Sequence, residues 1–568
     1  MHSTTPASSL AAALLLAGCG GGGGGGEPPP SQDPPPPPPP PTAQFGDVTA
    51  QSGIDYRLAL SRLSQISEST FGGAAAGDYD GDGDIDVFIV RGDQAPNLLY
   101  QNVGSLVFIE VAGQAGVANT KSPTENYRHS GPTFADMDGD GDLDLFLGGV
   151  FGDPSLVFRN NADGTFEDVT EGSGIDELGA DHNFSAAFGD YDLDGDLDLV
   201  VSHWGTPRNT NDPGDTEHLW RNVSAEAGRI KFEGASVEAG ISPSILTLPD
   251  PRRTERDADF TFTPTFARLD DDHYPDLLMA ADFNTSQIFL NNGDGTFRNV
   301  TDVAVVIDDN GMGSAVGDYD NDGDLDWFVS SIWTPRNSLP AYPGAEGSRI
   351  GNRLYRNDGG GVLVDVSNSA GVANGGWGWG ACFADFDSDG HLDIYHTNGW
   401  EPGSGDFIDY SEDSSRLFIS DGEGGFDERA TELGISDRHN GRGIVCADFD
   451  EDGDVDVLML HKDPTLSATL WENQGTSNNY LRVKLNGLPP NTEAAGARIT
   501  VRIGADVQLR EISVGSNYTS QNPTVQVFGL GSSATVDELV VEWPGGDQTS
   551  VRTDVGGNQT LVLDHPSL

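Results

Sequence analysis

The sequence is poor in basic residues, in cysteine and in long apolar runs. Lys and Arg number 30 against 90 Asp and Glu, which gives a formal net charge of -60 at pH 7. Nucleic-acid binding needs a basic surface that neutralises phosphates, so we expect no nucleic-acid partner. The same charge argues against docking on anionic lipid through a polybasic patch. Three cysteines cannot build a disulfide-rich scaffold.

The longest apolar run near the N-terminus, residues 10–17, is too short to span a bilayer and ends in Leu16-Ala17-Gly18-Cys19. This sequence resembles the lipobox of bacterial lipoproteins. The resemblance implies a signal peptide over residues 1–18, lipidation of Cys19, and a location outside the cytoplasm, at the outer membrane or cell surface. A plain signal peptide is the alternative.

Residues 19–44 are rich in Gly and Pro and contain eight consecutive prolines, Pro34 to Pro41. Glycine gives a flexible coil, and eight prolines form a stiff spacer of about 25 Å. We expect this tether to hold a folded body off the membrane, with the lipid as the only membrane contact.

A nine-residue Asp-rich segment recurs seven times, and we number the copies loop 1 to loop 7. They are residues 78–86, 136–144, 190–198, 268–276, 318–326, 385–393 and 448–456. The seven loops hold 34 of the 90 acidic residues, so the charge is patterned. Disorder, the competing explanation of high charge with only 36% hydrophobic residues, is thereby rejected.

Each loop is followed by an apolar run, then by an apolar pair that in most copies ends in Asn, such as Leu99-Tyr100-Gln101-Asn102, and then by a short Phe-led strand. About four strands per unit without helical periodicity predict an all-β fold, a seven-bladed β-propeller over residues 45–475. The last unit lacks an outer strand, which residues 45–49 can supply to close the ring. An open solenoid is the alternative, and it leaves both observations unexplained.

The loops carry Asp at positions 1, 3, 5 and 9 and Gly at position 6, and position 7 can offer its backbone carbonyl. Such a cage of hard oxygen ligands suits Ca²⁺, although a single copy reads equally well as a solvated turn. We expect about six calcium sites. Their ligand positions are Asp78, Asp80, Asp82, Asp84 and Asp86; Asp136, Asp138, Asp140, Asp142 and Asp144; Asp190, Asp192, Asp194, Asp196 and Asp198; Asp318, Asp320, Asp322, Asp324 and Asp326; Asp385, Asp387, Asp389, His391 and Asp393; and Asp448, Asp450, Asp452, Asp454 and Asp456.

Loop 4 departs from the pattern, because Arg268 stands at position 1 and His273 at position 6. We expect no tight calcium site there, with the guanidinium pairing with Asp272 or Asp276. Cys382 and Cys446 lie three and two residues before their loops, hence with opposite strand parity. From this we expect two buried free thiols rather than a disulfide.

The loops resemble the FG-GAP/VCBS repeats of integrin α-like propellers. The tail, residues 476–568, resembles the ASPIC/UnbV domain through Gly515-Ser516-Asn517-Tyr518, Phe528-Gly529-Leu530-Gly531 and Val541-Glu542-Trp543-Pro544. The combination is similar to the family of cartilage acidic protein and its bacterial relatives, and it implies calcium-dependent binding or adhesion. Alternating apolar and polar residues in the tail predict a small β-sandwich-like domain, with no catalytic constellation.

If the Asp loops join the first and second strands of each blade, the other connections emerge on the opposite face. Aromatic, Arg and His residues in those connections suit a sugar or an acidic ligand. The candidates are His182, His203, Trp204, Arg208, Trp333, Arg336, Trp377, Trp379, Trp400, His439, Arg442 and His461. Each residue alone is better explained by packing and hydrogen bonding; only the set carries the hypothesis.

Three function classes remain. A calcium-stabilised surface module that binds a glycan or protein ligand is favoured, and we expect it to be a monomer. An extracellular enzyme acting on polysaccharide, or with metal assistance, is second; it needs converging groups, for which His129, His182, His203 and His461 are candidates. A structural envelope spacer is third.

Overall fold

The computed structural model describes residues 43–61, 72–179, 182–206, 218–241, 259–334, 351–401, 409–515 and 517–568. The expected signal peptide, Cys19 and nearly all of the tether lie outside these residues, as do Arg208 and Arg336. Among the helices that are described, none has both the length and the apolar character needed to cross a membrane.

The chain is all-β, as predicted, and its main body is a series of antiparallel sheets that alternate with the Asp-rich loops. Strands that follow one another along the chain are neighbours in each sheet. The first three sheets are β2 (Ala74–Gly77), β3 (Asp86–Ile89), β4 (Leu98–Asn102) and β5 (Phe108–Glu110); β6 (His129–Ala135), β7 (Asp144–Gly149), β8 (Leu156–Asn160) and β9 (Phe166–Asp168); and β10 (Ala186–Gly189), β11 (Asp198–Val201), β12 (Leu219–Asn222) and β13 (Phe232–Gly234).

The series continues in the same way to residue 473. The next sheets are β14 (Thr261–Ala267), β15 (Asp276–Ala281), β16 (Gln287–Asn291) and β17 (Phe297–Asn299); β18 (Ser314–Gly317), β19 (Asp326–Val329), β20 (Arg353–Asn357) and β21 (Leu363–Asp365); β22 (Gly378–Ala384), β23 (Asp393–Asn398), β24 (Arg416–Ser420) and β25 (Phe426–Glu428); and β26 (Gly441–Ala447), β27 (Asp456–His461) and β28 (Thr469–Asn473). Short helices at α1 (Thr49–Ser52), α3 (Ala112–Ala115), α4 (Ser224–Ala227) and α6 (Ala430–Leu433), and the 3₁₀ turn η1 (Ile175–Glu177), follow outer strands.

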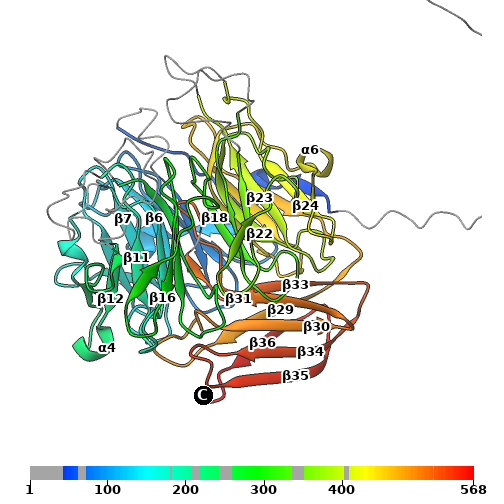
Figure 1. Cartoon of the computed structure of the whole chain (residues 1–568). Helices are drawn as coiled ribbons and strands as arrows, with labels where there is room; N and C mark the ends of the chain where they lie inside the picture. The colour runs from blue at the N-terminus through cyan, green and yellow to red at the C-terminus, as the bar shows by residue number, and fades with distance from the viewer. Residues whose placement is uncertain are drawn as a thin grey trace, which may run out of the picture. The chain divides into compact units, whose positions relative to one another are not determined.

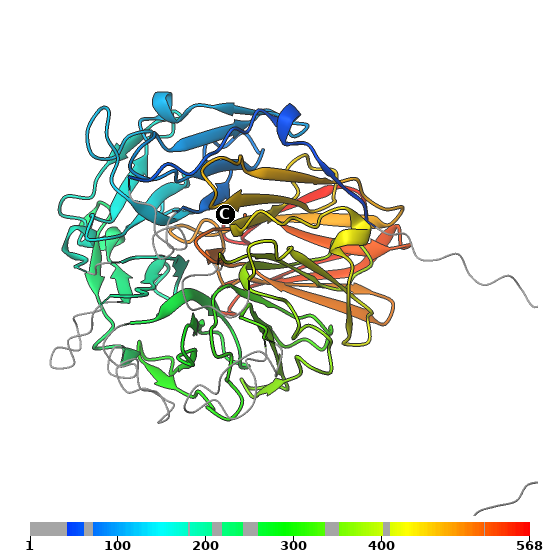
Figure 2. The same cartoon turned by 90° about the horizontal axis from the view of Figure 1, so that it is seen from above.

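The first strands of the sheets form a closed ring, as in a propeller. Strands β2, β6, β10, β14, β18, β22 and β26 contact one another in this order, and β26 contacts β2. Figure 2 shows the chain passing around this ring from blue through cyan and green to yellow. The N-terminal strand β1 (Phe45–Asp47) pairs with β28, with Phe45 opposite Asn473, so the N-terminus supplies the missing outer strand as expected.

The recurring Asn residues connect neighbouring sheets. The Nδ2 group of Asn160 donates to the carbonyl of Leu143 in its own loop (3.1 Å) and to that of Tyr79 in the preceding loop (2.8 Å). Equivalent bonds are made by Asn102, Asn222, Asn291, Asn357 and Asn473. This geometry gives a physical reason for the Asn at the end of each third strand, and Ser420 is the copy that lacks the amide.

The hydrophobic core lies between facing sheets. In β3, Val87 and Ile89 pack in a cluster with Leu458, whereas Phe88 packs in another cluster with Leu145. Both faces of the second strands are therefore buried, which explains why they read as continuous apolar runs.

Cys382 and Cys446 form a disulfide between β22 and β26, with 6.6 Å between their Cα atoms. The prediction of two free thiols is wrong. Neighbouring sheets face each other with opposite faces, so residues of opposite parity, rather than of equal parity, meet in the space between them. Both cysteines accordingly lie in one core cluster.

The C-terminal region forms two sheets around a shared core (Figure 1). Their strands are β33 (Gln526–Gly531), β29 (Asn479–Asn486) and β36 (Thr560–Asp564) in one sheet, and β31 (Asp506–Glu511), β30 (Arg498–Ile503), β34 (Thr535–Glu542) and β35 (Thr549–Gly556) in the other. The core includes Trp543, Phe528 and Leu481, all fully buried. Two facing sheets with one core agree with the predicted sandwich-like domain.

One connection of this region enters the centre of the ring. Strand β32 (Val514–Gly515) pairs with β10, and Tyr518 is completely buried. The side chain of Gln521 exchanges two hydrogen bonds with the backbone of Phe134 in β6, at 2.7 and 2.8 Å. The motif around Asn517 and Tyr518 thus occupies the middle of the propeller.

Candidate functional site

The Asp-rich loops share one backbone conformation, set by position 6. The glycine there has φ of 94° to 103° in loops 1, 2, 3, 5, 6 and 7, which favours glycine over other residues. In each of these loops its N–H donates to the position-1 Asp, for example Gly141 to Asp136 at 2.9 Å. The turn thereby brings the position-1 carboxylate back over the loop.

The position-9 Asp anchors the loop to the sheet. Asp144 accepts from the backbone N–H of Met137 at 2.9 Å with Oδ2 and from that of Asn160 at 2.8 Å with Oδ1. The same pair of bonds recurs in all seven loops, including loop 4. Burial raises the pKa of these carboxyl groups, to about 8 for Asp86 and about 9 for Asp326.

The position-3 Asp is different, because one of its oxygens is buried without a hydrogen-bond partner. This holds for Oδ1 of Asp138, Asp192, Asp320 and Asp387, in loops 2, 3, 5 and 6. Positions 1, 3 and 9 of loops 1, 2 and 5 each bring one carboxylate oxygen within 4.8 Å of the others, as do Asp190, Asp192 and Asp194 in loop 3. Burial and then neighbouring carboxylates raise the pKa of Asp138, Asp192 and Asp320.

These carboxylate clusters fit a hard divalent cation. Buried carboxylate oxygens without donors are costly, and oxygen atoms converging from one short loop are the ligand type of Ca²⁺. In loop 6 the imidazole of His391 contacts the amide of Asn321 at 3.1 Å, so its side chain is directed toward loop 5. This orientation leaves the backbone carbonyl of His391 as its contribution to a cation in loop 6.

Loop 4 carries a positive charge on Arg268, but the carboxylate that pairs with it is Glu542 and not the predicted Asp272 or Asp276. Arg268 NH2 lies 2.7 Å from Glu542 Oε1 in the C-terminal region, and its Nε donates to the backbone carbonyl of Asp272 rather than to a carboxylate of the loop. The prediction considered carboxylates of the loop alone, because the sequence gives no sign that β34 lies beside it.

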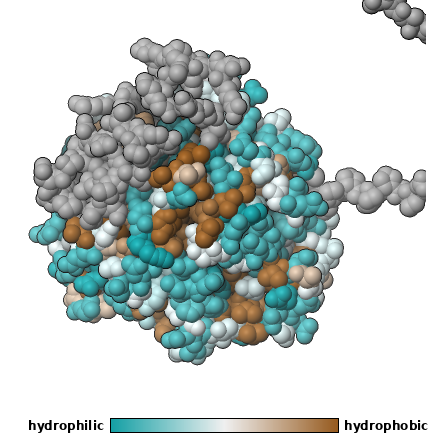
Figure 3. Space-filling model, viewed as in Figure 1, coloured by the Kyte–Doolittle hydropathy of each residue, from teal (hydrophilic) through white to brown (hydrophobic). Residues whose placement is uncertain are grey.

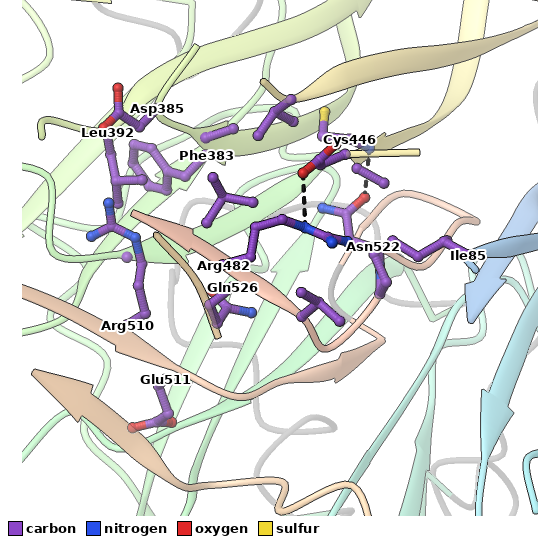
Figure 4. A pocket seen from close by; sticks show the side chains of 18 of the residues that line it. Ile85, Phe383, Asp385, Leu392, Cys446, Arg482, Arg510, Glu511, Asn522 and Gln526 are labelled. Carbon is purple, nitrogen blue, oxygen red and sulfur yellow. Dashed lines mark hydrogen bonds and ion pairs between the residues drawn. The ribbon is translucent and has the colours of Figure 1, made fainter. Parts of the chain in front are cut away.

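Basic residues of the C-terminal region, in turn, contact position-1 carboxylates of loops 1 and 7. Lys484 Nζ lies 2.9 Å from Asp78, and Arg482 Nε lies 2.8 Å from Asp448. Both arginines of Figure 4, Arg482 and Arg510, line a cavity of about 110 Å³ between the two regions. Arg510 is fully buried, and burial lowers its pKa although Asp385 and Asp318 act to raise it. The C-terminal region therefore covers the loop end of the ring.

The opposite end of the strands carries an aromatic cluster. Trp204, Trp377 and Trp400 are partly buried and pack against a group that includes Trp379 and Tyr518. The rings of Trp377 and Trp400 are stacked, with centroids 4.8 Å apart and an interplanar angle of 9°. Figure 3 shows a brown area of apolar residues amid hydrophilic surface on one face of the molecule, and this area does not mark the tryptophans, because tryptophan is not hydrophobic on the scale used there. The predicted tryptophans thus lie together, apart from Trp333, which contributes its carbonyl to the hydroxyl of Tyr410 at 2.6 Å.

The predicted basic residues are divided between packing and exposed positions. Arg442 is 3% exposed, with its guanidinium carbon 4.1 Å from the ring centroid of Trp379. His203 is buried and its Nδ1 lies 3.2 Å from the carbonyl of His182. His129 is likewise buried, which lowers its pKa to about 4.

His439 and His461, also predicted, are brought together with a residue that was not predicted, Asp437. Asp437 Oδ2 lies 3.2 Å from His439 Nδ1 and 3.5 Å from His461 Nε2. The sequence signal was present in the Asp-x-His spacing before β26, but the contact with the end of β27 depends on the strand register.

Comparison with known proteins supports the resemblance drawn from the loops and the tail. The FG-GAP-like repeat model matches residues 78–147, 136–201, 268–329 and 344–396, and the ASPIC and UnbV model matches residues 487–567. Cartilage acidic protein 1 of Homo sapiens is 27% identical over 536 residues, covering 87% of this chain and 71% of that protein. The Mus musculus protein is 27% identical over 530 residues, covering 84% and 71%.

Two solved structures show a weak similarity to this chain. One is an Agrocybe aegerita lectin that recognises non-reducing terminal N-acetylglucosamine (TM-score 0.31, 15% identity, 73% of this chain and 84% of that chain). Another is the Niastella koreensis GH74 enzyme (TM-score 0.37, 11% identity, 90% of this chain and 69% of that chain).

Proposed function

We propose that the protein is a calcium-binding, extracytoplasmic propeller, attached to a membrane through lipid at Cys19, that binds a glycan or protein ligand at the strand ends opposite the Asp-rich loops. The observation that carries the calcium part is the buried, partnerless Oδ1 of the position-3 Asp in loops 2, 3, 5 and 6. A cation is the group that offsets the cost of such an oxygen.

Calcium would be held by the carboxylates at positions 1, 3, 5 and 9, and it would neutralise charges that otherwise repel one another within nine residues. In loops 1 and 7 the position-1 Asp also contacts Lys484 or Arg482. In loop 7, Asp448 Oδ2 faces Arg482 while its buried Oδ1 has no hydrogen-bond partner and can serve a cation. The same carboxylate can therefore bind calcium and fix the C-terminal region.

Two observations support a location outside the cytoplasm. The Cys382–Cys446 disulfide is a bond that persists in oxidising compartments. The likeness to cartilage acidic protein 1 is consistent with it. The lipid attachment itself depends on Leu16-Ala17-Gly18-Cys19, which lies outside the described residues.

The ligand face is proposed at the aromatic cluster because the C-terminal region covers the other end of the ring. Partly exposed, parallel tryptophan rings offer an apolar surface on which a sugar ring or an apolar side chain can lie. Arg208 and Arg336, in the connections after β11 and β19, remain candidates for polar contacts to the same ligand.

Calcium binding is tested by equilibrium dialysis of the chelator-treated protein. We expect six sites, with loop 4 excluded because Arg268 already supplies a positive charge. Seven sites, or fewer than four, would contradict the assignment of ligands.

The ligand face is tested on a glycan array, with and without chelator, using the wild type and Trp400→Ala. We expect binding by the wild type and a loss of about tenfold or more in the variant, since one ring of the stacked pair is removed. Trp471→Ala, at a partly buried tryptophan of β28, is the matched control and should bind normally. Equal binding by a folded Trp400→Ala protein would rule out this face.

A further inference from the structure

A cluster of metal-ligating side chains, chemically distinct from the Asp-rich loops, is formed by Asp437, His439 and His461, in the connection before β26 and at the end of β27. One ligand atom of each residue lies within 4.8 Å of the other two. Gly441 pairs with His461 in the register of the two strands, which places the preceding residues 437–440 beside the end of β27. None of these atoms belongs to an Asp-rich loop.

The orientation of His461 is fixed by its second nitrogen. Nδ1 lies 2.6 Å from the backbone carbonyl of Ser467, and since a carbonyl can only accept, Nδ1 carries the proton. In the neutral imidazole, Nε2 then presents a lone pair. His461 is 3% exposed, and its Nε2 is buried without a hydrogen-bond partner. Metal-binding histidines characteristically donate their other N–H to a carbonyl or carboxylate in this way.

The carboxylate of Asp437 is oriented in a similar manner. Its Oδ1 accepts from the backbone N–H of His439 at 2.6 Å, so that Oδ2 faces both imidazoles, 3.2 Å from His439 Nδ1 and 3.5 Å from His461 Nε2. The backbone of Asp437 is held by Ser415, whose Oγ accepts its N–H at 2.9 Å and whose N–H donates to its carbonyl at 2.7 Å. Two of the three side chains are therefore positioned before any ion binds.

We propose that Asp437, His439 and His461 bind one Zn²⁺ ion. Two imidazole nitrogens and one carboxylate oxygen are a recurrent ligand set of zinc sites that keep an open coordination position. Imidazole also distinguishes this site from the Asp-rich loops, because Ca²⁺ prefers oxygen ligands. A site of this composition discriminates between the two ions by ligand type.

The zinc site is open to solvent on one side. The side chain of His439 is 57% exposed, whereas those of Asp437 and His461 are 6% and 2% exposed. The neighbouring Lys462 places its Nζ 5.7 Å from the ring centroid of Trp400. Lys462 thus links the proposed zinc site to the aromatic cluster, and the exposed side at His439 is where an oxygen of a bound ligand or a water molecule can complete the coordination.

The test uses the full-length protein, stripped with chelator and then saturated with Ca²⁺ to occupy the Asp-rich loops. Zn²⁺ is titrated by calorimetry into the wild type, His439→Ala and His273→Ala. His273 is the matched control, because its side chain is 46% exposed and lies beside one carboxylate, Glu542, without a second imidazole. We expect the wild type and His273→Ala to bind one more Zn²⁺ than His439→Ala, or to bind that ion about tenfold or more tightly.

Equal zinc binding by the wild type and His439→Ala would overturn the proposal, as would displacement of the ion by excess Ca²⁺. Equal zinc binding would identify the three residues as a hydrogen-bonded cluster that holds no metal. If His439→Ala does not fold, Co²⁺ added to the calcium-saturated wild type serves as the second measurement. Visible absorption typical of mixed nitrogen and oxygen coordination supports the site, and the weak spectrum of hydrated Co²⁺ refutes it.

Discussion

Replacing two aspartates of one loop separates the proposed calcium-binding role from the structural role. Asp138, at position 3 of loop 2, has a buried Oδ1 without a hydrogen-bond partner, whereas both oxygens of Asp144, at position 9, accept backbone N–H groups. The loss of stability caused by Asp→Ala should therefore depend on calcium at position 3, whereas at position 9 it should occur in both conditions. Asp144→Ala should destabilise the protein with or without calcium, and Asp138→Ala only when calcium is present.

The magnitudes follow from the bonds that each substitution removes. Asp144→Ala leaves the buried N–H groups of Met137 and Asn160 without acceptors, at a cost of about 1–3 kcal/mol each and hence about 2–6 kcal/mol in total. In chelator, Asp138→Ala should change the free energy of unfolding by about 1 kcal/mol or less. The substitution removes a carboxylate whose buried Oδ1 has no hydrogen-bond partner, and it relieves the repulsion between Asp138 and Asp140. With free calcium at about 100 times Kd, losing the site costs up to about 2.7 kcal/mol.

Urea unfolding of both variants and the wild type, in calcium and in chelator at equal ionic strength, measures these differences. The reasoning fails if Asp138→Ala loses the same stability in chelator as in calcium, since the loop would then be a hydrogen-bonded turn and not a cation cage. It fails equally if Asp144→Ala is neutral in chelator.

Three other predictions concern the scaffold. Denatured but unreduced protein should show no free thiol from Cys382 or Cys446, and Cys382→Ser should lower the free energy of unfolding by about 4 kcal/mol, given a sequence separation of 64 residues; full alkylation of both thiols without reductant would contradict the bond. Asn160→Ala should cost about 1–3 kcal/mol because it removes one bond to the preceding loop and one to its own loop, while Asn161→Ala, at an exposed side chain, should be near neutral in the same urea experiment. Burial raises the pKa of Asp308 to about 7, above its value in the unfolded chain. The protonated form therefore favours the folded state, and the free energy of unfolding falls as pH rises from about 4 to about 7. Asp308→Asn should remove this part of the pH dependence of stability, and an unchanged profile would show that Asp308 ionises without cost.

The fold could be predicted because its signals are local and repeated. The Asp-rich loop, the third-strand end and the short outer strand recur in the same order in each unit, so the spare strand at Phe45 and the gap after Asn473 could be matched by counting. The carboxylate pattern of the loops, from which calcium binding is proposed, was equally local. What the sequence could not show is that position 9 doubles as the anchor of the third strand, because that contact joins Asp144 to Asn160 across a hairpin.

The features that were missed depend on which faces of distant segments meet. The disulfide was predicted wrongly because residues of equal strand parity were expected to meet between neighbouring sheets, although facing sheets present opposite faces to each other. The partner of Arg268 was missed because Glu542 belongs to another region of the chain. Asp437 was missed because it becomes a neighbour of His461 only through the pairing of β26 with β27.

The C-terminal region gives the two ends of the propeller different roles. Lys484, Arg482 and Arg268 form ion pairs between this region and the loop end, and Tyr518 reaches through the centre of the ring to contact Trp379, with ring centroids 5.3 Å apart. A ligand therefore cannot reach Asp78, Asp448 or Arg268 at position 1 of their loops without displacing these contacts, whereas the tryptophans and His439 at the other end are partly exposed. Tyr518 belongs to the C-terminal region, which forms ion pairs with the loops. Calcium bound at the loop end would therefore stabilise the aromatic cluster at the other end. Loss of ligand binding in chelator would then result from weaker packing of the aromatic cluster and would not require direct contact between calcium and the ligand.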